Sequence, residues 1–120
     1  MASDRVGKLV ILLERAGTPE AVQSALRYAS TAAAMDLAVE VHAAGMAVAL
    51  LRRGAEADNS AWQAALAQAL ELGVLLFACP QARAAQDMVA DDLIDGVAGI
   101  RGAASLLAAG MAPGGRFMVF

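Results

Sequence analysis

The stretch Leu9-Val10-Ile11-Leu12-Leu13 is a continuous aliphatic run that is too short for a helix. Runs of this kind are typical of a strand that is buried on both faces in a parallel sheet. Thr18-Pro19-Glu20 then supplies a helix N-cap, a proline at the first helical position and a carboxylate in the first turn. The apolar spacing that follows predicts a helix of about four turns. The opening of the chain therefore reads as a strand followed by a helix.

Strands and helices continue to alternate along the rest of the chain. The segment 46–51 stays open between a short strand and a single helical turn, because apolar runs this short do not reveal their period. The polar stretch at 52–59 predicts a loop. Short alternating elements predict an α/β domain with a largely parallel sheet and helices on both faces. Further strands are expected at 37–43, 74–78, 97–100 and 117–120, and further helices at 60–73, 81–89 and 102–109.

The composition excludes several classes of protein. Of 120 residues, 59% are apolar and 18% charged, which is typical of one folded domain and not of a disordered chain. The net charge of -3 gives no basic footprint for nucleic acid. The counts of one cysteine and one histidine allow neither an internal disulfide nor a His/Cys metal site. We expect a single domain over residues 1–120, with no metal, no cofactor and no nucleic-acid partner.

A membrane-spanning or exported protein is also not expected. The longest uncharged apolar stretches, 41–51 and 72–82, are about half the length of a spanning helix. Asp4, Arg5 and Lys8, ahead of a short apolar run, do not form the pattern of a signal peptide. A reducing, cytoplasmic setting without membrane association is therefore the expectation.

Functional residues are expected where strands lead into helices. In an open α/β sheet, ligands bind beyond the carboxyl ends of the strands. Three segments are predicted there: the turn that starts at Glu14, the turn at Gly45, and Cys79-Pro80-Gln81. Cys79 leaves a buried strand and enters a helix start, where free N–H groups stabilise a thiolate. Arg83, four residues on, is expected to lie one turn above the sulfur.

The residues alone leave the role of Cys79 open. A free cysteine is often a small buried side chain that only packs, and this alternative stands beside the reactive thiol. No second cysteine stands at a C-x-x-C spacing, so a dithiol redox pair is absent. His42, a lone histidine within a predicted strand, is more typical of a packed or surface residue than of a catalytic base.

Three segments that follow one another along the chain carry a family resemblance. They are Lys8-Leu9-Val10-Ile11-Leu12, then Glu40-Val41-His42 with Gly45 soon after, then Leu76-Phe77-Ala78-Cys79 followed by Asp92-Leu93-Ile94-Asp95-Gly96-Val97. In this order they resemble the DsrE-like (DsrE/DsrF-like) family of small sulfur-relay proteins, from Lys8 to Phe120. The resemblance implies a five-stranded, mostly parallel sheet, and so a three-layer α/β/α domain, assembled as a homotrimer or homohexamer. It also implies that Cys79 carries sulfur as a persulfide.

We therefore expect an intracellular sulfur carrier or sulfurtransferase. It would hold sulfane sulfur as a persulfide on Cys79 and pass it to a partner thiol, and its partners would be small sulfur-carrier or sulfur-donor proteins. With no resolving cysteine in the chain, the acceptor must come from outside. Contacts to the substrate or partner are expected from Pro80, Gln81, Arg83, Glu14 and Gly45.

The alternative function is a non-catalytic, homo-oligomeric binding or assembly module with a packed cysteine. In both cases the chain has few charged residues with which to cover its surface. Some apolar surface is therefore expected to be shared between subunits. The segments 46–51 and 117–120, together with Met111, are the expected contributors.

Overall fold

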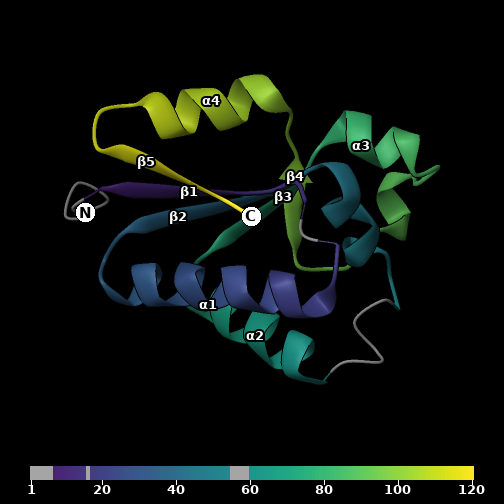
Figure 1. Ribbon diagram of the computed structural model, residues 1–120, viewed down its shortest axis with the longest axis horizontal. Helices are drawn as coiled ribbons and strands as arrows, with labels where there is room; N and C mark the ends of the chain where they lie inside the picture. The colour runs from purple at the N-terminus through teal and green to yellow at the C-terminus, as the bar shows by residue number, and fades with distance from the viewer. Residues whose placement is uncertain (1–6, 16, 55–59) are drawn as a thin grey trace.

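The computed structural model describes residues 7–15, 17–54 and 60–120 (Figure 1). The strands form one five-stranded sheet in the order β4-β3-β2-β1-β5, and all neighbouring strands are parallel. This confirms the predicted α/β fold with its five-stranded parallel sheet. The elements follow one another as β1 (Lys8–Leu13), α1 (Pro19–Ala34), β2 (Ala38–Ala43), η2 (Gly45–Leu51), α2 (Ser60–Glu71), β3 (Leu75–Ala78), α3 (Pro80–Ala85), η4 (Ala90–Asp92), β4 (Val97–Ile100), α4 (Ala103–Met111) and β5 (Gly115–Val119).

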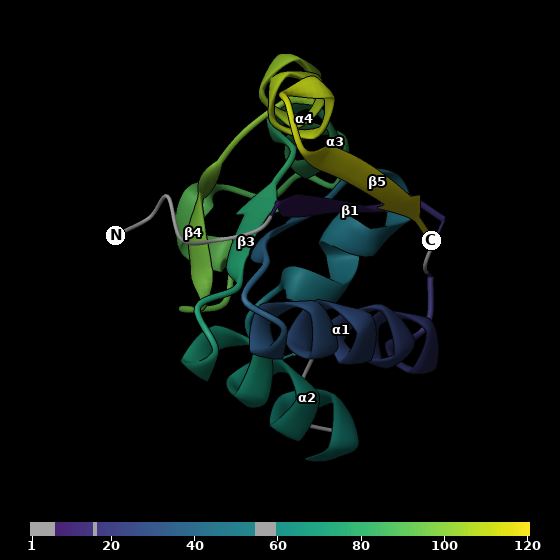
Figure 2. The ribbon, with the colours of Figure 1, turned by 90° about the vertical axis from the view of Figure 1, so that its left-hand side faces the viewer.

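The direction in which the chain crosses the sheet decides which face each helix covers. From β1 through β2 and β3 to β4 the chain moves toward one edge, and from β4 to β5 it returns to the opposite edge. Because crossovers between parallel strands are right-handed, the helices of the first two outward steps, α1 and α2, must lie on the face opposite to the helix of the return step, α4. Figures 1 and 2 show α1 and α2 on one face of the sheet and α4 on the other. Helix α4 packs mainly on β1 and β5.

The core lies between the sheet and the helices α1 and α2. Alternate strand residues such as Ile11 and Val41 face these helices and are fully buried. Trp62 of α2 and Leu26 of α1 meet them in the same cluster. The helix start predicted at Thr18 is confirmed, since its hydroxyl oxygen accepts a hydrogen bond from the Ala21 N–H at 3.2 Å.

The segment 46–51, left open at the sequence level, belongs to the 3₁₀ helix η2. Ala47, Val48 and Leu51 turn into the chain's own core, while Met46 is 64% exposed. Most of this segment is therefore not free to meet another subunit. Of the predicted loop at 52–59, residues 55–59 lie outside the described residues, as do the N-terminal residues 4 and 5. In the described part of the chain, no helix has the length and apolar character needed to cross a membrane.

The helix predicted over 81–89 is shorter than expected, because α3 ends at Ala85. Asp87 adopts a left-handed conformation with φ 54°. The Met88 N–H then donates to the Arg83 carbonyl at 3.0 Å, and the Asp87 N–H to the Ala84 carbonyl at 3.0 Å. This pattern is a Schellman C-cap, which usually takes glycine at the left-handed position. An aspartate there gave no stop signal in the sequence.

Gly45 shapes the turn that follows β2. Its φ is +51°, and a Cβ at this position would lie 2.8 Å from the carbonyl oxygen of Glu14. The same carbonyl accepts a hydrogen bond from the Met46 N–H at 3.3 Å. The ends of β1 and β2 therefore approach closely at a point that admits no side chain.

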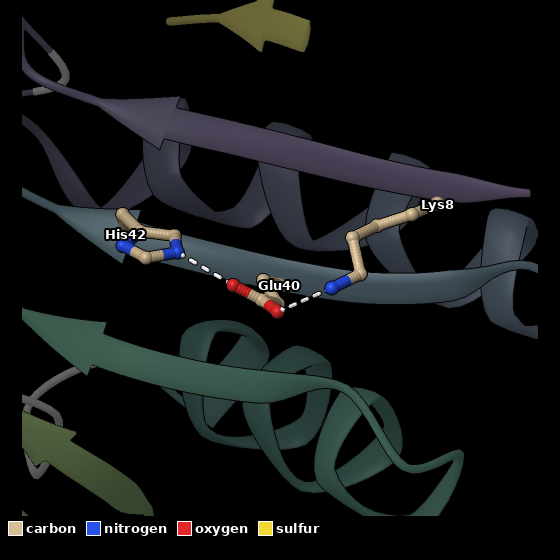
Figure 3. A network of polar contacts seen from close by, with 3 residues as sticks. All are labelled: Lys8, Glu40 and His42. Atoms are coloured by element: carbon tan, nitrogen blue, oxygen red, sulfur yellow. Dashed lines mark hydrogen bonds and ion pairs between the residues drawn. The ribbon is translucent and has the colours of Figure 1, made fainter. Parts of the chain in front are cut away.

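A buried polar network lies on the sheet face that carries α4 (Figure 3). Glu40 of β2 is 8% exposed and His42 is 3% exposed. The Lys8 Nζ donates to Glu40 Oε2 at 3.0 Å, and His42 Nε2 lies 2.9 Å from Glu40 Oε1. Both oxygens of the carboxylate are thus partnered, which is the condition under which a buried charge is tolerated.

The partners of Glu40 decide its ionisation. Burial raises the pKa of this carboxyl, but the hydrogen bonds from His42 and Lys8 and the positive charge of Lys8 outweigh it. The net result is a pKa below 4.5, the usual value for a glutamate. A carboxyl whose pKa is lower in the folded chain stabilises the fold above its unfolded-state pKa. That stabilisation is lost as the pH falls through the folded-state pKa.

Substitution of Gly45 by alanine is expected to destabilise the chain. The left-handed backbone costs an alanine about 1–2 kcal/mol, and the contact with the Glu14 carbonyl adds to this. Gly54→Ala is the matched control, since its φ is +91° but a Cβ there meets nothing within 4 Å. Urea unfolding should show a larger loss for Gly45→Ala than for Gly54→Ala, and equal losses would remove the steric argument.

Substitution of Glu40 by glutamine is expected to lower stability in a pH-dependent way. At neutral pH the variant should lose roughly 1–2 kcal/mol relative to the wild type, because a charged acceptor of two hydrogen bonds is removed. As the pH falls below the ordinary pKa of a glutamate, the unfolded wild-type chain takes up a proton before the folded chain does, so the difference should shrink toward the lower folded-state pKa of Glu40. Urea unfolding of both chains from pH 7 to pH 3.5 measures it. A difference that stays constant over this range contradicts the argument.

Candidate functional site

The carboxyl ends of the strands border a cavity of about 360 Å³. Because the strands are parallel, the segments that follow them emerge at one edge of the sheet. The wall includes residues that follow β1, β2, β3 and β4, and the first turns of α4. Its side chains with polar or reactive groups are Glu14, His42, Cys79, Gln81 and Arg101.

Cys79 joins β3 to α3 at this edge. It is the N-cap residue of α3, and Pro80 occupies the first helical position. Its backbone N–H donates to the Ala43 carbonyl at 2.8 Å, so the pairing of β2 with β3 continues past the end of β3. The side chain makes no capping hydrogen bond and is half-buried. The thiol therefore lines the cavity on a backbone fixed by both the sheet and the helix.

The structure brings some of the predicted site residues together and leaves others outside. Cys79, Gln81, Glu14 and Gly45 all line the cavity, whereas Pro80 and Arg83 are not part of its wall. Arg83 turns back on its own segment, where its Nη1 donates to the Met88 carbonyl at 3.4 Å. The C-cap at Asp87 creates that acceptor by folding Met88 back over α3. The cation at the cavity comes from another element.

That cation is Arg101, which the sequence analysis did not select. Its backbone N–H donates to the Ala78 carbonyl at 3.0 Å, which extends the pairing of β3 with β4. Its guanidinium lies 4.4 Å from the centre of the Phe77 ring, at a distance typical of a cation–π contact. The signal was present, since Arg101 is the first charged residue after the strand predicted at 97–100.

His42 is both a buried residue and part of the cavity wall. Its ring centre lies 5.0 Å from that of Phe77. The Phe77 ring therefore has two neighbours, the imidazole of His42 and the guanidinium of Arg101. From the sequence, His42 is expected to be a packed or surface residue, and no local pattern assigns it to a cavity. Glu40, two residues earlier and therefore on the same face of β2, was the sign that the ring has a polar partner.

A larger groove of about 850 Å³ lies between α1 and α2. Its wall is made of small and polar side chains such as Ser30, Ala64 and Gln68, and it contains no thiol or imidazole. The smaller cavity holds the chain's one cysteine and one histidine together with an arginine. We therefore assign the candidate site to the smaller cavity on the basis of its chemistry.

Solved structures with the same fold come from several organisms. The ychN protein from E. coli aligns with a TM-score of 0.78 at 22% identity, covering 95% of this chain and 99% of that chain. The protein of unknown function MTH1491 from Methanobacterium thermoautotrophicum aligns with a TM-score of 0.75 at 21% identity, with the same coverage of 95% and 99%. BT1422 from Bacteroides thetaiotaomicron, also of unknown function, gives 0.70 at 17% identity, covering 100% and 98%.

At these identities the structural similarity shows the fold alone. No protein of curated function matches the chain. The sequence model of the DsrE/DsrF-like family, in contrast, matches residues 7–120. That range includes every strand and helix given above for the described residues. The chain therefore belongs to the DsrE/DsrF-like family.

Proposed function

We propose that the protein is an intracellular sulfur carrier or sulfurtransferase that holds sulfane sulfur as a persulfide on Cys79. Membership of the DsrE/DsrF-like family supports a role related to sulfur relay. The observation that carries the proposal to a residue is the position of Cys79 in a cavity at the carboxyl edge of the sheet, beside His42 and Arg101. That edge is where open α/β sheets bind their ligands.

The proposed reaction has two steps that balance without an oxidant or reductant. In the first, the Cys79 thiolate attacks the terminal sulfur of a donor persulfide R–S–SH and forms a new S–S bond. The donor's own S–S bond breaks, and its thiolate leaves with the electron pair and takes up the proton that Cys79 lost. In the second step an acceptor thiolate attacks the terminal sulfur of the Cys79 persulfide in the same way. Cys79 is then a thiol again.

The acceptor thiol in the second step has to come from another molecule, because the chain has one cysteine. An attacking thiol of the same chain would convert the persulfide to an internal disulfide and release the sulfur as hydrosulfide. A carrier without a resolving cysteine avoids that side reaction. We propose small sulfur-carrier or sulfur-donor proteins as the partners.

Sulfur uptake is expected to depend entirely on Cys79. After incubation with a persulfide donor, mass spectrometry should find one added sulfur atom on wild-type protein, located on the peptide that contains Cys79. Cys79→Ser should stay unmodified, because serine changes one atom and removes the nucleophile. Equal uptake by the two chains would show that the carrier role is wrong.

The second candidate function is a homo-oligomeric binding or assembly module with a packed cysteine. Exposed apolar side chains favour assembly in either case: Met111 is 76% exposed, Val119 66% and Leu107 51%. Phe117 and Leu75 add to this apolar surface with 39% and 47%. We propose that these residues meet other copies of the chain in a homotrimer or homohexamer, since monomers rarely leave large apolar patches in water.

The assembly proposal predicts a particle larger than the 12.2 kDa monomer. Light scattering at micromolar concentration should give a mass three or six times that value. Met111→Glu should reduce it, whereas Met35→Glu, at the end of α1 and 64% exposed, should leave it unchanged. A wild-type chain that stays monomeric would exclude both the trimer and the hexamer.

Thiol reactivity separates the two candidate functions. A carrier must expose its sulfur to reagents while folded, whereas a cysteine that only packs is inert until the chain unfolds. Alkylation of the native protein by iodoacetamide at neutral pH should therefore modify Cys79 within the time in which a small-molecule thiol reacts. A native chain that resists the reagent, but reacts in urea, would favour the assembly module.

A further inference from the structure

The imidazole of His42 has one ring nitrogen with a partner and one without. Glu40 as a carboxylate can only accept hydrogen bonds, so His42 Nε2, at 2.9 Å from Glu40 Oε1, carries the hydrogen. In the neutral imidazole the other nitrogen, Nδ1, is then a lone-pair acceptor. It is buried and has no hydrogen-bond partner among the described residues. Buried polar atoms of this kind are uncommon and call for a functional explanation.

The unpartnered nitrogen points toward the candidate site. The side chain of His42 is 4% exposed, and the residue forms part of the cavity wall. Figure 3 shows the ring nitrogen that is not bonded to Glu40 directed away from it, toward the carboxyl end of β2. The loops that border the cavity begin at that end. Nδ1 is thus an acceptor offered to whatever occupies the cavity.

The sheet register places Cys79 on the same side as this nitrogen. His42 pairs with Phe77, and Cys79 follows Phe77 by two residues in extended backbone with φ -72° and ψ 128°. Residues two apart in extended chain share a face, so the thiol and the imidazole project to the same side of the sheet. Two residues advance the chain by about 6.6 Å. The resting thiol makes no hydrogen bond to Nδ1.

A persulfide on Cys79 would add one sulfur atom at the wall of the cavity that His42 also lines. Its terminal sulfur lies one S–S bond, about 2.05 Å, beyond Sγ. We propose, resting on the proposed function, that His42 Nδ1 binds the sulfane sulfur of the Cys79 persulfide by accepting a hydrogen bond from its S–H group. Glu40 is the positioning residue, since its bond to Nε2 fixes the ring orientation and leaves the lone pair on Nδ1. Lys8 holds the second oxygen of Glu40 in turn.

Neither of the other charged groups in the cavity wall is a buried acceptor beside Cys79. Arg101 has five N–H donors and no lone pair, and its guanidinium lies over the Phe77 ring. Glu14 is an exposed carboxylate that follows β1, and β2 separates β1 from the strand that leads to Cys79. The hydrogen bond to the imidazole adds no oxidation or reduction to the sulfur transfer. When an acceptor thiol takes the terminal sulfur, the S–H proton travels with that sulfur, and the proton of the acceptor passes to Cys79 Sγ.

The test uses the fact that the chain has one histidine and one cysteine, so that both signals are assigned without ambiguity. Methyl methanethiosulfonate converts Cys79 of the full chain to the methyl disulfide. Hydrosulfide then displaces methanethiolate and leaves the persulfide, which mass spectrometry verifies. Imidazole ¹⁵N chemical shifts are recorded before and after. We expect the Nδ1 resonance to shift on loading and the Nε2 resonance to keep its protonated position.

Two outcomes would overturn the inference. One is an unchanged Nδ1 resonance in a chain whose persulfide is verified. The other is a folded chain in which Cys79 does not react with methyl methanethiosulfonate, because the cavity then has no room for a second sulfur. Neither depends on a biological donor. Failure of the proposed function has a different signature: a chain that shows the Nδ1 shift after chemical loading but takes up no sulfur from any persulfide donor.

Variants measure the effect on sulfur binding. The equilibrium of sulfur between glutathione persulfide and Cys79 should shift against the protein by about three- to tenfold in His42→Phe, which keeps a ring on Phe77 but no acceptor. In His42→Phe the buried Glu40 carboxylate also loses one hydrogen-bond partner. The double variant Glu40→Gln/His42→Phe removes that carboxylate, so that the same measurement reports the loss of the imidazole alone. Glu40→Gln alone should show both imidazole tautomers in the ¹⁵N spectrum and a smaller loss. Equal sulfur occupancy in wild type and both His42 variants would contradict the inference.

Discussion

The handedness of the crossovers between parallel strands is the constraint on which this architecture depends. Four strands are added in one direction, and the fifth returns to the far side of β1. Right-handed connections therefore place α1 and α2 on one face and α4 on the other, over β1 and β5. On that second face, the main contacts of α4 among the described residues are with β1 and β5, and not with β2 or β3. The polar side chains of Glu40 and His42 lie on that face.

The buried carboxylate of Glu40 links this architecture to the site. A lone carboxylate at 8% exposure would cost several kcal/mol of desolvation, so its two partners are a condition of the fold. Lys8 reaches it from β1 because Val10, two residues on, pairs with Glu40, and His42 reaches it from the same strand. The consequence is an imidazole held in one orientation at the end of the sheet where Cys79 lies. The burial of the Glu40 charge and the orientation of the His42 ring thus depend on the same three side chains, Lys8, Glu40 and His42.

Much of the fold could be predicted from the sequence, because local signals and global architecture agree. The aliphatic run at Leu9, the N-cap at Thr18 and the alternation of short elements were sufficient for the parallel sheet. The early end of α3 was not predictable, since its left-handed cap is Asp87 and not glycine. Arg83 lies one turn beyond Cys79, since its backbone N–H donates to the Cys79 carbonyl at 2.9 Å, but its guanidinium donates to the Met88 carbonyl, which the chain supplies by folding back.

The site was harder to predict because its parts belong to different strands. The pattern around Cys79 is local, and its place at the end of β3 was therefore foreseeable. Arg101 and His42 meet Phe77 through strand order and register, which no local pattern contains. In the order β4-β3-β2, strand β3 leads to Cys79 and lies between the other two. Arg101, which follows β4, and His42, near the end of β2, therefore lie on either side of β3.

In the proposed function, the size of the cavity restricts how a partner could take sulfur from Cys79. A volume of about 360 Å³ holds a small molecule or a few side chains, and not a folded surface. Cys79 is half-buried, and its backbone N–H donates to the Ala43 carbonyl at the edge of the sheet. A protein acceptor must therefore present its cysteine on a protruding segment that enters the cavity. Within that space the attacking sulfur, the transferred sulfur and Cys79 Sγ have to lie close to one line, since the new S–S bond forms as the old one breaks. A hydrogen bond that fixes the direction of the terminal sulfur shortens the search for that arrangement, and His42 is the buried acceptor from which it can come.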